Sequence, residues 1–176
     1  MSNAPFYTPQ DIQQILQGMR EELTFVGINE LKTPAEVDSA LSQTKGTALL
    51  AINSVCGCAA GNARPGVALA LQNKTIPDHL YTVFAGQDPA ATAQARGYMP
   101  QEAPSSPSFF LFKDGQLVYT MPRHMIEGRD ARAVALDLIT AFNMHCDATG
   151  PSVSPEVFAK SPSVHVCGSQ IPTVTS

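Results

Sequence analysis

The stretch TALLAINSVCGCAAGNARPG, residues 47–66, combines a short apolar run, two cysteines separated by one glycine, and a run of small residues. The apolar run Thr47–Asn53 is typical of a β-strand that is covered on both faces. The small residues after Cys58 are compatible with a helix, which we expect over residues 59–73. A strand, a cysteine turn and a helix in this order predict a thiol at the start of a helix.

This position favours the reactive form of Cys56. An ordinary cysteine thiol has a pKa near ~8.5 and is mostly protonated at neutral pH. The unpaired N–H groups and the positive dipole end of a helix N-terminus stabilise an anion. Residues i and i+2 of a helical turn point in nearly opposite directions, so we expect Gly57 to supply the unusual backbone angles that a Cys56–Cys58 disulfide needs. The pair therefore predicts redox chemistry.

Helices and strands alternate on both sides of this stretch. Thr8, Thr33 and Asp88 are each followed by proline, which predicts three capped helix starts, and Thr8 and Thr33 also fit capping boxes. We expect a kink at Pro65, inside the cysteine helix. Further strands are predicted at residues 27–31 and 80–85, a hairpin at Asp114-Gly115 between SFFLF and QLVYT, and a last helix at residues 127–146.

This order predicts an α/β fold with a central mixed sheet flanked by helices. We divide the chain into an N-terminal helical extension (residues 1–24), one domain (residues 25–146) and a Pro/Ser-rich tail (residues 147–176).

Composition excludes several classes of function. The 176 residues carry a net charge of −4 without a basic patch, so neither nucleic acid nor an anionic membrane is expected as a partner. No apolar run approaches the roughly 20 residues that span a bilayer, and the N-terminus does not have the pattern of a secretory signal. Four unevenly placed cysteines do not fit the disulfide framework of a small secreted domain. We therefore predict a cytoplasmic protein.

A second signal lies in APSSPSFFLFKDG, which begins at Ala103. Pro107 directly precedes a predicted strand, where it can only begin the strand. The segment resembles the cis-proline loop of the thioredoxin fold, which lies opposite the reactive cysteine and offers its backbone to the substrate. The resemblance implies a cis Ser106–Pro107 bond, substrate binding at both residues, and a thioredoxin-like domain with an extra N-terminal helix.

The motifs NSVCGCAAGNARP, VFAGQD, APSSPS, PRHMIEG and AFNMHC together resemble the bacilliredoxin family, over about residues 8 to 146. The resemblance implies an enzyme without a bound cofactor that removes bacillithiol from oxidised cytosolic proteins by thiol-disulfide exchange, and that a reductase regenerates. Cys56 is then the nucleophile and Cys58 the resolving or isomerising thiol. The buried aspartate of ordinary thioredoxins corresponds to Leu50, so that acid is missing. The tail with Cys167 lies outside the resemblance.

Other interpretations stay open. Arg64 could bind an anionic thiol substrate or stabilise a thiolate, or it could be a solvated helix residue. The enzyme could isomerise protein disulfides without any small thiol. Alternatively, thiolates one residue apart suit soft metal ions, which predicts a metal or cluster carrier with further ligands from the set Cys146, Cys167, His145 and His165. Asn53 and Ser54 are expected to hydrogen-bond within the cysteine turn and not to be catalytic.

Overall fold

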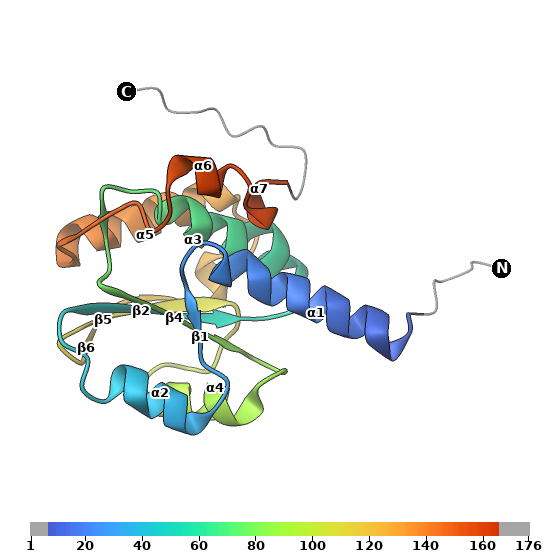
Figure 1. Cartoon of the computed structure of the whole chain (residues 1–176). Helices are drawn as coiled ribbons and strands as arrows, with labels where there is room; N and C mark the ends of the chain where they lie inside the picture. The colour runs from blue at the N-terminus through green and yellow to red at the C-terminus, as the bar shows by residue number, and fades with distance from the viewer. Residues whose placement is uncertain (1–6, 166–176) are drawn as a thin grey trace.

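The computed structural model describes residues 7–165 of the chain, so that Cys167 lies outside the described residues. A five-stranded sheet lies between two groups of helices (Figure 1). In spatial order its strands are β1 (Asn29–Glu30), β4 (His79–Phe84), β2 (Thr47–Asn53), β5 (Ser108–Lys113) and β6 (Gln116–Met121). The first three of these are mutually parallel, and β5 and β6 are each antiparallel to the preceding strand. The mixed sheet that the sequence predicts is confirmed.

Strand β2 lies at the centre of the sheet, and all seven of its residues are buried. Its side chains alternate between two cores, because Leu49 and Ala51 pack on one face and Leu50 and Ile52 on the other. The first face is covered by α1 (Pro9–Thr24), α3 (Arg64–Ala70) and α5 (Ala131–His145), and the second by α2 (Pro34–Leu41) and α4 (Pro89–Gly97) (Figure 1). This strand order and these helix layers form the predicted thioredoxin-like fold with an added N-terminal helix.

Two of the three predicted helix caps are present. The side chains of Thr8 and Thr33 each accept a hydrogen bond from the third helical N–H, and both sites are complete capping boxes. Asp88 precedes α4 but makes no such bond. Its carboxylate instead pairs with Arg20 of α1 at 2.8 Å, which connects the N-terminal helix to the start of α4.

The hairpin between β5 and β6 forms as predicted. Asp114 and Gly115 have φ angles of 48° and 79°, the left-handed values that a tight hairpin turn requires. A 3₁₀ turn, η2 (Arg123–Met125), follows the hairpin, and because residues 126–130 are not helical, α5 starts at Ala131, later than expected. Asp130 then caps α5 by accepting a hydrogen bond from Ala133 N–H at 2.8 Å.

The cysteine helix begins with a π turn, η1 (Ala59–Ala63), before α3. Pro65 has no N–H for the carbonyl of Gly61, and its ring would crowd that group in a regular α-helix. The N–H of Arg64 reaches back to the carbonyl of Ala59, five residues earlier, and this wider turn accommodates the proline. Where the sequence predicts a kink, the structure therefore has a π turn directly after the cysteines.

Residues 148–165 pack on the body of the molecule. β7 (Ala148–Thr149) pairs with β3 (Thr75–Ile76), and two short helices follow, α6 (Pro155–Phe158) and α7 (Pro162–His165) (Figure 1). Ser152 Oγ donates to the carbonyl of Val26 at 2.7 Å. Helix α5 is thus not the last helix, contrary to expectation. Within residues 7–165, none of the helices has the length and apolar character to cross a membrane.

Candidate active site

The cysteine turn lies between the end of β2 and the π turn. The carbonyl of Cys56 accepts hydrogen bonds from the N–H groups of Ala59 at 3.0 Å and Ala60 at 3.2 Å, so Cys56 stands where the helix begins. Both Cys56 and Cys58 are half-buried, and neither is part of a disulfide. The thiol thus occupies the helix start that the sequence predicts.

The two sulfur atoms face each other. Cys56 Sγ and Cys58 Sγ are 2.7 Å apart. Ser54 Oγ donates a second hydrogen bond to Cys56 Sγ at 3.1 Å, and it accepts one from the N–H of Cys56 at 3.4 Å. Two side-chain groups, the Ser54 hydroxyl and the Cys58 thiol, therefore lie within hydrogen-bond distance of Cys56 Sγ.

This environment separates the pKa values of the two thiols. Burial alone would raise the pKa of Cys56, but hydrogen bonds from Cys58, Ser54 and the Ala59 N–H, with the charge of Arg123, lower it overall. Burial raises the pKa of Cys58, and so do its hydrogen bond to Cys56 and the negative charge there, against a smaller effect of Arg123. The arrangement favours a thiolate on Cys56 beside a protonated Cys58.

The loop before β5 adjoins this turn. Ile52 pairs with Ser108, so Pro107 lies beside the end of β2, from which the cysteine turn continues. The Ser106–Pro107 peptide bond is cis, as the sequence predicts.

Arg123 is the charged residue of this region that sequence reasoning missed. Its Nη1 donates to the carbonyl of Ser106 at 3.4 Å, and its charge lowers the pKa of both cysteines. Its side chain is 42% exposed and pairs with Glu127 at 3.2 Å. The available signal was the motif PRHMIEG, which follows the hairpin strand and contains this arginine.

Arg64 occupies a different position from the one expected. Its side chain is only 2% exposed, and its Nε pairs with the Glu22 carboxylate of α1 at 2.9 Å. Its Nη1 donates to the carbonyl of Ser54 at 2.9 Å. A guanidinium held in this way faces the protein interior, so it is neither a solvated helix residue nor presented to a ligand from solvent.

Gly57 lies between two free thiols and is not among the described residues with positive φ. The unusual backbone angles expected of it belong to the disulfide form and stay a prediction. Apart from its chain neighbours and the nearby helix backbone, no atom lies within 4 Å of the Cβ position of Gly57.

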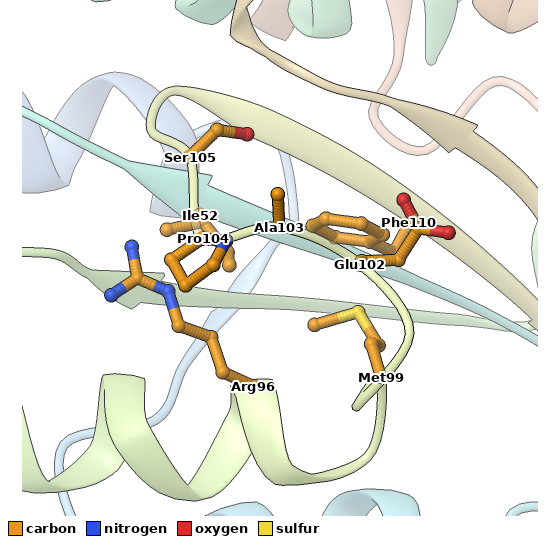
Figure 2. A pocket seen from close by; sticks show the side chains of 8 residues that line it. All are labelled: Ile52, Arg96, Met99, Glu102, Ala103, Pro104, Ser105 and Phe110. Carbon is orange, nitrogen blue, oxygen red and sulfur yellow. The ribbon is translucent and has the colours of Figure 1, made fainter.

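A small, shallow pocket lies between α4 and the loop before β5 (Figure 2). Ile52, Met99, Phe110 and Ser105 help to line it, and Arg96 of α4 extends toward Pro104. The Nε of Arg96 has no hydrogen-bond partner. The pocket therefore adjoins both the end of β2 and the loop that carries Ser106.

Cys146 lies at the end of α5, in the core, and is 5% exposed. Burial raises the pKa of its thiol. Among residues 7–165 there is no group of three or more His, Cys, Asp or Glu side chains arranged to hold a metal ion. Cys146 therefore does not form a metal-ligand set with Cys56 and Cys58. Two other expected ligands, Cys167 and the side chain of His165, lie outside the described part of the chain.

The sequence profile of the family described as "Disulphide isomerase" matches residues 12–146. A bacilliredoxin of Salinibacter ruber is 52% identical over 146 residues, covering 81% of this chain and 86% of the relative. A bacilliredoxin of Symbiobacterium thermophilum is 58% identical over 125 residues, covering 71% of this chain and 89% of the relative. One from Staphylococcus aureus is 48% identical over 133 residues, covering 76% of this chain and 91% of the relative.

Solved thioredoxin structures are more distant. Oxidised thioredoxin O2 of Arabidopsis thaliana superposes with a TM-score of 0.46 and 21% identity, over 66% of this chain and 96% of that chain. Oxidised thioredoxin of Plasmodium falciparum gives a TM-score of 0.45 and 18% identity, over 66% of this chain and 98% of that chain.

Proposed function

The chain belongs to the bacilliredoxin family of thiol-disulfide oxidoreductases, and we propose that it removes a low-molecular-weight thiol such as bacillithiol from oxidised proteins. Cys56 is the nucleophile and Cys58 the resolving thiol. The observation that carries this proposal is the asymmetry of the pair: the two sulfurs are 2.7 Å apart, and the pKa is lowered at Cys56 but raised at Cys58. Only the thiolate is an effective nucleophile in disulfide exchange.

The reaction proceeds in two exchanges. The Cys56 thiolate attacks the sulfur of the small thiol in the mixed disulfide, a new Cys56 disulfide forms, and the substrate protein leaves as a thiolate that takes up a proton. Cys58 then loses its proton and attacks Cys56 Sγ, so that the small thiol leaves as a thiolate and a Cys56–Cys58 disulfide forms. A reductase that supplies two electrons and two protons restores the two thiols.

Other residues of the region receive supporting roles. We assign Ser106 and Pro107 to substrate binding, since their loop adjoins the cysteine turn. We assign Gly57 the role of placing no side chain between the two cysteines, at a position where no atom outside its neighbours and the nearby helix backbone lies within 4 Å. We assign the solvent-facing charge to Arg123 and not to Arg64, since Arg64 is buried against Glu22.

The chemistry of this pair fits a reducing compartment. Each removal of a small thiol leaves a Cys56–Cys58 disulfide that must be reduced before the next turnover, which requires a reductase, and we therefore place the enzyme in the cytoplasm. Its protein substrates there are those with a small thiol attached to an exposed cysteine.

A model protein carrying one bacillithiol, glutathione or coenzyme A group on a single cysteine tests the proposal. Intact-mass measurement after mixing with reduced enzyme should show faster loss of bacillithiol than of the other two groups. Equal rates for all three would contradict the assignment of bacillithiol, and no loss of any group would contradict the removal of small thiols altogether.

Isomerisation of protein disulfides without a small thiol is the second candidate, favoured by the description of the matching family. Refolding of a scrambled multi-disulfide protein distinguishes the two activities. Recovery of native disulfides without any small thiol, together with unchanged S-thiolated substrate, would favour isomerisation.

A further inference from the structure

Four polar side chains lie buried behind the cysteine turn. Glu22 of α1, Asn53 and Ser54 at the end of β2, and Arg64 of α3 are exposed by 8%, 4%, 7% and 2% respectively. The exchange steps above give none of them a role. Buried polar groups are costly unless they are hydrogen-bonded, so their partners indicate what they do.

The ion pair between Glu22 and Arg64 joins the N-terminal helix to the cysteine helix. Arg64 Nε and Glu22 Oε2 are 2.9 Å apart. The desolvation of two buried charges opposes their mutual attraction, so stability alone is a weak explanation for such a pair. The pair does fix the direction of the guanidinium.

That guanidinium holds the backbone before the cysteines. Arg64 Nη1 donates to the carbonyl of Ser54 at 2.9 Å and to Asn53 Oδ1 at 3.2 Å. Asn53 Oδ1 also accepts a hydrogen bond from the N–H of Ser54 at 2.9 Å. The peptide groups on both sides of the Ser54 Cα are therefore fixed, one directly by Arg64 and one through Asn53.

The fixed backbone directs the Ser54 hydroxyl at the reactive sulfur. Ser54 Oγ accepts from the N–H of Cys56 at 3.4 Å and donates to Cys56 Sγ at 3.1 Å. A hydrogen bond to the charged form of a group favours that form. The other groups facing this sulfur are the Cys58 thiol, the Ala59 N–H and the charge of Arg123.

We propose that Ser54 is a further catalytic residue, whose hydroxyl donates to Cys56 Sγ while the thiolate attacks and again when it departs, and that Arg64 and Glu22 are positioning residues that hold Ser54 in place. The hydroxyl keeps its proton throughout, so it adds no covalent step. This inference rests on the proposed function, in which Cys56 is the nucleophile. It also gives α1 a role in positioning the site, through Glu22.

The pH dependence of Cys56 alkylation tests the role of Ser54. The measurement uses Cys58→Ser protein, whose hydroxyl can still donate, and peptide mapping to follow Cys56 alone. Ser54→Ala should raise the pKa of Cys56 by about one unit. Ser54→Thr keeps a hydroxyl and should return the pKa most of the way to its original value. A shift below about a quarter of a unit in Ser54→Ala would overturn the proposal. Alkylation reports the thiol whether or not Cys56 attacks the substrate, so failure of the proposed function would be recognised separately, as exchange activity retained by Cys56→Ser.

A double-mutant cycle tests the positioning role of Arg64. Lysine keeps the charge but cannot reach three acceptors as the guanidinium fork does. Arg64→Lys should raise the pKa of Cys56 when Ser54 is present and leave it unchanged in a Ser54→Ala background, because Arg64 acts through Ser54. Equal shifts in both backgrounds would overturn the positioning role.

Asp88→Asn is the matched control. It removes the ion pair in which Asp88 lies 2.8 Å from Arg20 of α1, and neither of these residues contacts Ser54. It should not raise the pKa of Cys56, and a rise equal to that of Arg64→Lys would overturn the inference by showing a general effect of α1.

If Arg64→Lys does not fold by circular dichroism, Glu22→Gln replaces it. Loss of a negative charge would by itself lower the pKa of Cys56, so a rise supports positioning and a fall or no change overturns it.

Discussion

Arg123 Nη1 donates a hydrogen bond to the carbonyl of Ser106 over 3.4 Å, and the N–H of Arg123 donates to Ser105 Oγ over the same distance. These contacts join the turn after β6 to the loop before β5. They also bring a positive charge to the cysteine pair, since Arg123 lowers the pKa of both Cys56 and Cys58.

Replacing Arg123 should therefore reduce the fraction of Cys56 that is thiolate at pH 7. Arg123→Gln removes a positive charge that lowers the pKa of Cys56, so this pKa rises. We expect this rise to be small, because the partly exposed charge of Arg123 is screened by solvent. The measurement is the rate of Cys56 alkylation against pH. Arg129→Gln, which breaks the Arg129–Asp137 pair instead, should not move the profile; an unchanged profile in Arg123→Gln would contradict the assignment.

Cys146 should be inert in the folded protein. Burial raises the pKa of its thiol, so at pH 7 it is almost entirely protonated and shielded from reagents. Cys146→Ala combined with Cys167→Ser should retain most exchange activity toward an S-thiolated protein. Loss of most turnover with an unchanged circular dichroism spectrum would instead indicate that one of these distal thiols takes part in resolution.

Gly66 should be sensitive to any added side chain. A Cβ at this position would lie 2.7 Å from Val134 Cγ1 and 3.2 Å from the carbonyl oxygen of Ala131, so α3 and α5 would have to separate. Gly66→Ala should lower the free energy of unfolding by about 1 to 3 kcal/mol, measured by urea denaturation. Gly61→Ala is the matched control, because nothing lies within 4 Å of its Cβ position, and its effect should stay within about 1 kcal/mol. Equal midpoints for the two variants would argue against tight packing at Gly66.

Local chemistry was sufficient to predict most of the fold. The run Thr47–Asn53, the hairpin at Asp114-Gly115 and the boxes at Thr8 and Thr33 each depend on residues within a few positions of one another. Asp88 shows where such reasoning ends, because its carboxylate is taken by Arg20, 68 residues away in the chain. Pro65 was expected to kink the helix, and the structure instead accommodates it by a π turn in the preceding segment, Ala59–Ala63.

The candidate site was less accessible to sequence reasoning. The cysteine pair and the cis Ser106–Pro107 bond were predicted from local motifs and a family resemblance. Arg64 was expected to be solvated or to meet a bound thiol, but it is buried against Glu22, 42 residues earlier, and no local pattern predicts that contact. Likewise, Arg123 meets the site through Ser106, a contact that only the tertiary fold creates.

The central claim is that Cys56 attacks and Cys58 resolves, and trapping of the intermediate tests it most directly. Reduced Cys58→Ser and Cys56→Ser proteins are each mixed with a bacillithiolated substrate and analysed by intact mass and peptide mapping. The account predicts a stable bacillithiol adduct on Cys56 in Cys58→Ser, since no thiol remains to expel it, and neither adduct nor transfer in Cys56→Ser. An adduct on Cys58 in Cys56→Ser, with transfer preserved, would contradict the account.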